Sequence, residues 1–215
     1  MGFYQTLYDA TEQQRQTLLA APLIAKTLRG DISQAEYVAF LHEAYHHVKH
    51  TTPLLMGLGS RLPEEKEWLR NAVAEYIEEE VGHQEWILND IAACGVDKEA
   101  ARQSQAAYAT EMMIAYAYDT IQRGNPIGFF GMVLVLEGTS VTTADPAANA
   151  IQATLGLPNT AFSYLRSHGS LDQEHVIFFE KLMDKIDDPQ EQQLIIHKAR
   201  RFYHLYAEIF RSITL

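Results

Sequence analysis

Cysteine is nearly absent from this chain, which has Cys94 alone among its 215 residues. A lone thiol excludes an internal disulfide and a thiolate-based zinc or iron–sulfur site, and it is typical of proteins kept in a reducing compartment. Basic residues are also scarce, because 17 Lys and Arg stand against 28 Asp and Glu and give a net charge of −11. Binding to a phosphate backbone requires a basic face, so we expect no nucleic-acid partner.

Long apolar runs are missing too. No stretch approaches the roughly 18 consecutive apolar residues of a membrane span. The N-terminal residues lack the basic region and apolar run of a signal peptide. We therefore expect a cytoplasmic protein without a membrane partner. A length of 215 residues with 47% hydrophobic residues indicates one domain, residues 1–215, large enough to bury a sizeable core.

Helical spacing of apolar residues runs through almost the whole sequence, and no segment shows the alternation of a strand. Ser33-x-x-Glu36 has the form of a capping box, Pro63 suits a helix start, and Gly95 suits the position after a helix end. The sequence predicts an all-α bundle of seven or eight helices. The helices that we place lie at residues 33–59, 63–94, 98–123, 127–142, 146–155, 160–186 and 189–213.

Acidic residues recur at one position on each of four predicted helices: Glu43, Glu80, Glu137 and Asp172. Two of them begin an acid-x-x-His step, to His83 and to His175, and His168 lies one turn before Asp172. Residues three apart share a helix face, so an acid and an imidazole at this spacing can hold the same ion. Such steps alone are weak indications, but a carboxylate on each of two helices and an acid–His step on two others is typical of a two-metal, oxygen-activating site.

Glu137 follows an apolar segment, residues 129–136, and is therefore expected to be buried. A buried carboxylate requires a cation, a partner or a proton. Metal binding is one solution, and a salt bridge to an arginine such as Arg166 is the alternative.

Glu80 and Asp172 each have a simpler interpretation. Glu80 ends a run of three glutamates, and such runs are usually solvated. Asp172 follows Ser170, so the two residues fit the first turn of a helix. We favour metal binding for both acids because each is followed three residues later by a histidine.

The segment around Glu43 leaves more than one assignment open. Histidines crowd it, and His46, His47 and His50 all share a face with Glu43 at helical spacing. We assign Glu43 as the ligand from helix order, and which of these three histidines joins the site stays open.

On these residues the chain resembles the haem-oxygenase-like di-metal oxidases and oxygenases, relatives of the TenA and PqqC proteins. The motifs that carry the resemblance are Glu43, Glu80-x-x-His83, Glu137 and His168-x-x-x-Asp172-x-x-His175. The resemblance implies a compact haem-oxygenase-like bundle, commonly dimeric. It also implies two iron ions, or manganese with iron, that activate O₂ to oxidise a small organic substrate.

The resulting hypothesis is a non-haem dinuclear iron oxidase or oxygenase that works as a homodimer. Its expected metal ligands are Glu43, Glu80, His83, Glu137, His168, Asp172 and His175. Glu43, Glu80 and Glu137 are also expected to take part in catalysis, and Phe129, Phe130 and Met132 to line the substrate pocket. The alternatives are a metal-free TenA-like hydrolase or cofactor-pathway protein, and a non-catalytic binder of a small ligand.

Overall fold

Helices make up most of the described part of the chain, and it contains no strand, as the sequence predicts. The computed structural model describes residues 2–213, with the side chains of residues 168–174 outside that description. The α-helices are α1 (Phe3–Ala10), α2 (Glu12–Leu19), α3 (Pro22–Leu28), α4 (Gln34–Val48), α5 (Thr51–Arg61), α6 (Glu67–Glu80), α7 (His83–Ala93), α8 (Lys98–Gln103), α9 (Tyr108–Arg123), α10 (Phe130–Leu155), α11 (Ser163–Met183) and α12 (Pro189–Ser212). Three short 3₁₀ helices, η1 (Glu64–Lys66), η2 (Pro126–Phe129) and η3 (Asn159–Ala161), join them.

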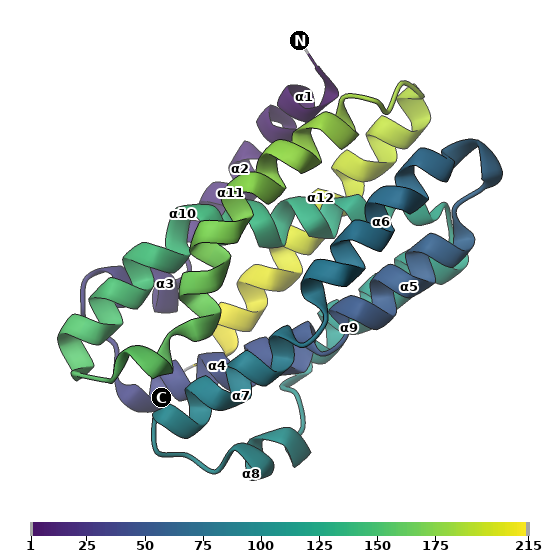
Figure 1. The fold of residues 1–215 in the computed structure, drawn as a ribbon. Coiled ribbons are helices and arrows are strands. Elements are labelled where there is room, and N and C mark those ends of the chain that lie inside the picture. Colours follow the sequence, from purple (N-terminus) through teal and green to yellow (C-terminus); the bar gives the residue numbers. More distant parts are fainter. Residues whose placement is uncertain (1, 214–215) are drawn as a thin grey trace.

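Helix α10 runs through the middle of the bundle, where α3, α11 and α12 pack against it (Figure 1). It is apolar on all sides at its start, and each residue from Phe130 to Val135 is buried. Gly131 allows α12 to approach closely, since a Cβ there would lie 2.5 Å from the Ala199 nitrogen. In the described part of the chain, Pro126–Leu155 is the one segment long and apolar enough to cross a membrane, and the bundle buries 61% of its most apolar window.

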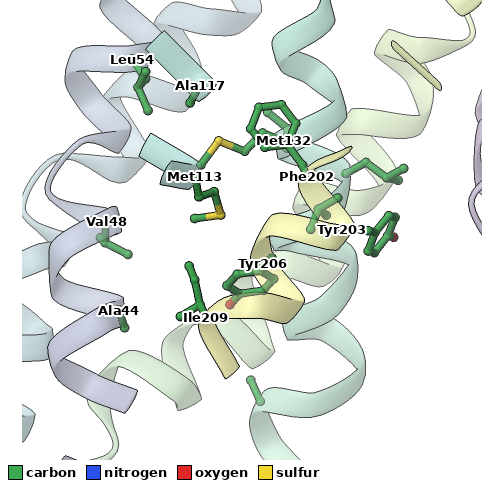
Figure 2. Close-up of a cluster of buried hydrophobic side chains, with 14 of the residues drawn as sticks. Ala44, Val48, Leu54, Met113, Ala117, Met132, Phe202, Tyr203, Tyr206 and Ile209 are labelled. Carbon is green, nitrogen blue, oxygen red and sulfur yellow. The ribbon is translucent and has the colours of Figure 1, made fainter. Parts of the chain in front are cut away.

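The core beside α10 is built by five helices (Figure 2). Apolar side chains from α4, α5, α9, α10 and α12 meet there and are buried. They include Val48, Leu54, Met113, Met132 and Phe202. This core fixes α4 and α10 relative to each other, and both helices contribute side chains to the candidate site.

The described residues form twelve α-helices and not seven or eight, because three predicted helices are divided and α1 to α3 lie before the first predicted helix. The predicted helix at 33–59 breaks after Val48, that at 63–94 breaks at Gly82, and that at 98–123 breaks after Gln103. Gly82 has a φ of 97°, a left-handed conformation that glycine adopts without steric cost. In contrast, the segments at 127–142 and 146–155 form one helix, because α10 continues through Pro146.

Candidate metal centre

The break between α6 and α7 places Glu80 beside His83. Glu80 is the last residue of α6, His83 is the first of α7, and Val81 and Gly82 turn the chain between them. The Glu80 Oε2 and His83 Nδ1 atoms are 3.1 Å apart, and the His83 side chain is buried. The two residues therefore meet across a helix break and not, as the sequence spacing suggests, on one continuous helix face.

Glu137 reaches the same region from the centre of α10. It shares a cavity lining with Glu80 and Tyr76. Burial and the nearby carboxylates of Glu137 and Glu79 raise the pKa of the Tyr76 hydroxyl far above its ordinary value. Arg166, the alternative partner for Glu137, donates instead to the Gln152 Oε1 atom at 2.7 Å.

His175 completes this group from α11. Its Nε2 atom lies 2.9 Å from the Glu79 Oε2 atom, and its ring packs edge-on against Tyr76 with 6.1 Å between ring centroids. The imidazole is buried, whereas the Glu79 side chain is 40% exposed. The last two residues of α6 thus each contact a histidine, one from α7 and one from α11.

Tyr76, Glu80 and Glu137 line a cavity of about 80 Å³, which we call the central cavity. His47, Tyr76, Glu80 and Glu137 are among its polar lining residues. His83 and His175 are not among the lining residues, but they contact Glu80 and Tyr76, respectively. The apolar lining comprises Val48, Leu54, Leu55, Phe129, Met132, Val133 and Leu136. Phe129 and Met132 thus occupy the predicted pocket, whereas Phe130 is buried against Phe179.

Glu43 does not lie with this group. Its carboxylate accepts a hydrogen bond from the Ala107 nitrogen at 3.1 Å and another from the Thr110 hydroxyl. Ala107 is the N-cap of α9, where a negative charge is stabilised by the helix dipole. The Glu43 carboxylate therefore holds the start of α9, and α4 reaches the central cavity through other residues.

His47 is the histidine of α4 that faces the central cavity. Its neighbours point elsewhere: the His46 Nε2 atom is 2.9 Å from the Ser104 hydroxyl, and the His50 Nδ1 atom is 3.0 Å from the Tyr118 hydroxyl. Burial lowers the pKa of His46 to about 4, so its imidazole is neutral at physiological pH. His47 lies one turn after Glu43, and this spacing was the available sequence signal for it.

The sequence analysis did not identify two residues near the site, Glu79 and Tyr206. Glu79 is part of a glutamate run whose individual directions depend on where α6 ends. Tyr206 lines the central cavity from α12, and nothing in its local sequence separates it from the other aromatic residues of that helix. Each becomes visible only when the packing of the helices is known.

The donor types around the central cavity fit iron or manganese, because both metals accept carboxylate and imidazole ligands. Among the described residues these donors meet in pairs, and no group of three or more is close enough to hold an ion. His168 and Asp172 lie outside the described residues, so their predicted metal binding stays a prediction.

A model of a family described as iron-containing redox enzymes matches residues 38–207. The chain belongs to this family. The matched segment contains every donor discussed above, from Glu43 to His175. A search of curated proteins finds no match.

This family member shares a haem-oxygenase-like fold with solved structures. A protein from Shewanella denitrificans, described as a domain of unknown function with a heme oxygenase-like fold, superimposes with a TM-score of 0.86 at 25% identity, over 99% of this chain and 92% of that one. A TenA homologue from P. horikoshii gives 0.79 at 12% identity over 100% of both chains. Heme oxygenase-1 from the cyanobacterium Synechocystis, in complex with heme, gives 0.77 at 8% identity over 99% and 92%.

Proposed function

We propose that this chain is a non-haem dinuclear iron, or manganese–iron, enzyme that uses O₂ to oxidise a small organic substrate. The observation that supports it most is that Glu80 and Glu137 line one cavity, with His83 in contact with Glu80 and His175 in contact with Glu79 and Tyr76. Membership of the iron-containing redox enzyme family supports it independently. The homodimer and the cytoplasmic location stay predictions.

The lining of the central cavity explains why a cation is expected there. Two carboxylates, of Glu80 and Glu137, face it. Bringing carboxylates together out of water is costly unless a cation offsets their charge. Bound iron would supply that charge and the capacity to reduce O₂.

Each described side chain has a definite task in this proposal. Glu80, His83, Glu137 and His175 would hold metal, and Glu79 would orient the His175 ring through its contact with Nε2. The raised pKa of Tyr76 keeps its hydroxyl protonated, so that it can donate a hydrogen bond beside Glu137. The apolar lining excludes water from the reacting substrate.

A TenA-like hydrolase with a thiol nucleophile is poorly supported by the one cysteine. Cys94 is buried at the end of α7, and it is not part of the central cavity lining. Burial raises the pKa of its thiol to about 11. A thiol with such a pKa is protonated at neutral pH, whereas the nucleophile is the thiolate.

Metal content per chain tests the proposal. Protein produced with added iron and manganese should contain close to two metal ions per chain by plasma emission spectroscopy. Glu137→Gln keeps the size of the side chain and removes a charged ligand, so most of the metal should be lost. Loading at the wild-type level in Glu137→Gln would refute the assignment of the site.

Glu43→Gln provides the matched control. It makes the same chemical change in a residue of α4 whose carboxylate binds the start of α9. It should keep its metal, because Glu43 contacts Ala107 and Thr110 away from the central cavity. Loss of metal in this variant, with the fold intact by circular dichroism, would instead restore Glu43 as a ligand.

A further inference from the structure

Trp86 stacks on His83, the histidine that contacts Glu80. The centroids of the two rings are 4.1 Å apart, and their planes are inclined by 30°. Aromatic pairs ordinarily have centroids roughly 4.5–7 Å apart, so this pair is closer than usual. The His83 imidazole therefore has a carboxylate 3.1 Å from its Nδ1 atom and an indole against its ring face.

Helix α7 carries these two rings on a face that runs from the interior to the surface. His83, Trp86 and Asn89 are three residues apart, which places them along one side of the helix. His83 is buried, Trp86 is half-buried and Asn89 is exposed. Trp86 thus touches His83 and is also open to solvent.

The proposed metal ligands themselves are poorly accessible to a soluble molecule. The side chains of His83, Glu80 and His175 are 3%, 15% and 8% exposed, respectively. Tyr76, the oxidisable ring that lines the central cavity beside Glu137, is 2% exposed. A soluble electron donor can therefore reach the candidate site more easily through Trp86 than through these side chains.

Indole is one of the protein side-chain groups that lose an electron most readily. A metal centre that has reacted with O₂ and has no substrate to oxidise is a strong oxidant, and it attacks its own surroundings unless electrons reach it. Electron transfer slows steeply as the gap between two groups grows. The ring contact between Trp86 and His83 therefore favours this indole as the electron source.

We propose that Trp86 relays single electrons from a soluble one-electron donor of the ascorbate type, through His83, to the metal centre when no substrate is present. This inference rests on the proposed function, because the oxidised metal is the electron acceptor. In each transfer the Trp86 indole loses one electron to the metal, and the donor returns one electron to the indole. No covalent bond forms or breaks in the protein, and the indole carries the same number of protons before and after the cycle. The donor is the species that is consumed.

Electron paramagnetic resonance of freeze-quenched samples tests the relay without measuring turnover. Iron-loaded, reduced protein mixed with O₂ in the absence of substrate and donor should form a tryptophan radical, and added ascorbate should remove it. The chain has two tryptophans, so Trp68→Phe leaves Trp86 alone. The radical should persist in Trp68→Phe, and its spectrum should narrow when the protein is made with ring-deuterated tryptophan.

Trp86→Phe keeps an aromatic ring against His83 and removes the easily oxidised indole. The yield of tryptophan radical per bound iron should fall at least tenfold in this variant. Trp86→Tyr restores an oxidisable ring, so a tyrosyl radical should appear there instead. A tryptophan radical in Trp86→Phe at the wild-type yield would overturn the proposal.

Trp68→Phe is also the matched control for the loss of a tryptophan. Trp68 is half-buried near the start of α6, and the Lys185 Nζ atom lies 5.4 Å from its ring centroid. It precedes Glu80 by roughly 18 Å along the helix, at 1.5 Å per residue. The radical yield should therefore be unchanged in Trp68→Phe, and a loss as large as that in Trp86→Phe would contradict the relay.

Iron content, measured on the same samples, separates the relay from the proposed function. Wild-type protein that binds no iron would refute the proposed function, and the relay with it. Iron-loaded protein that gives no tryptophan radical with O₂ would overturn the relay alone. A wild-type radical on tyrosine that disappears in Tyr76→Phe would overturn it as well.

Discussion

Two glycines of α10 should respond in opposite ways to the same substitution. Gly131 faces α12, and a Cβ there would lie 2.5 Å from the Ala199 nitrogen and 3.0 Å from the Ile195 carbonyl oxygen. These are backbone atoms, so relief requires the two helices to move apart. Gly138 lies on the same helix, two turns later, and a Cβ there would meet no atom of the described residues within 4 Å.

The expected magnitudes follow from two opposing effects. Alanine favours a helix over glycine by about 1 kcal/mol, which should stabilise Gly138→Ala by that amount. Overpacking costs about 1–3 kcal/mol, and contact with backbone places Gly131→Ala at the upper end of that range. After the helix-forming gain, Gly131→Ala should be destabilised by about 2 kcal/mol. The two variants should therefore differ by about 3 kcal/mol in the free energy of unfolding.

Urea denaturation followed by circular dichroism measures this difference. A chelator should be present, because Gly138 follows Glu137 and bound metal would add its own stabilisation. If Gly131→Ala is as stable as Gly138→Ala, then α10 does not pack closely against α12 and the central position of α10 is wrong.

Three further predictions concern the surroundings of the site. The Lys26 side chain, which has the largest influence, and the Ser33 N–H lower the pKa of Glu36, so Glu36→Gln should lower the free energy of unfolding by about 1–2 kcal/mol at pH 7. This loss should be constant above about pH 4.5, the ordinary pKa of a glutamate, and should vanish as the pH falls through the lowered pKa of Glu36. Urea titrations at several pH values measure it. The buried Asp90 carboxylate accepts from the Ser163 and Tyr164 nitrogens at 3.0 and 2.9 Å, so Asp90→Asn should cost about 1–3 kcal/mol and speed hydrogen exchange at the start of α11 but not in α10. With its raised pKa, Cys94 should react with a thiol reagent at pH 8 far more slowly in the native protein than in urea, and equal rates would contradict its burial.

Local sequence signals predict many of the helix starts and ends. Ser33 and Glu36 form the predicted capping box, with a bond from the Glu36 nitrogen to the Ser33 hydroxyl. Gly95 follows the end of α7 with a φ of 79°, and Pro189 begins α12. These residues act through their own backbone geometry, so the sequence alone predicts them.

The internal breaks depend on packing and are harder to predict. Gly82 is tolerated in either a helix or a turn, and the turn prevails where Glu80 and His83 can meet. Pro146 ordinarily interrupts a helix, yet α10 continues through it because Ala144, Ala148 and Ile151 are buried on both sides. In each case tertiary contacts override the local preference.

Local signals anticipate the placement of some candidate residues. Glu80 contacts His83 and lines the same cavity as Glu137, as an acid followed by a histidine and an acid inside an apolar run suggest; their metal binding stays a prediction. Glu43 shares its helical spacing with His47, and only the position of α9 shows that Glu43 holds a helix start while His47 faces the central cavity. Which residues of α4 face the cavity depends on how the helices pack against one another.

Anomalous diffraction at the iron absorption edge, from crystals grown with ferrous iron, tests the central claim most directly. The proposal predicts two anomalous peaks beside the central cavity, within bonding distance of Glu80, His83, Glu137 and His175, and no haem absorption in the same protein. Peaks at Glu43 and the start of α9, a single haem iron, or no peak above background would contradict it.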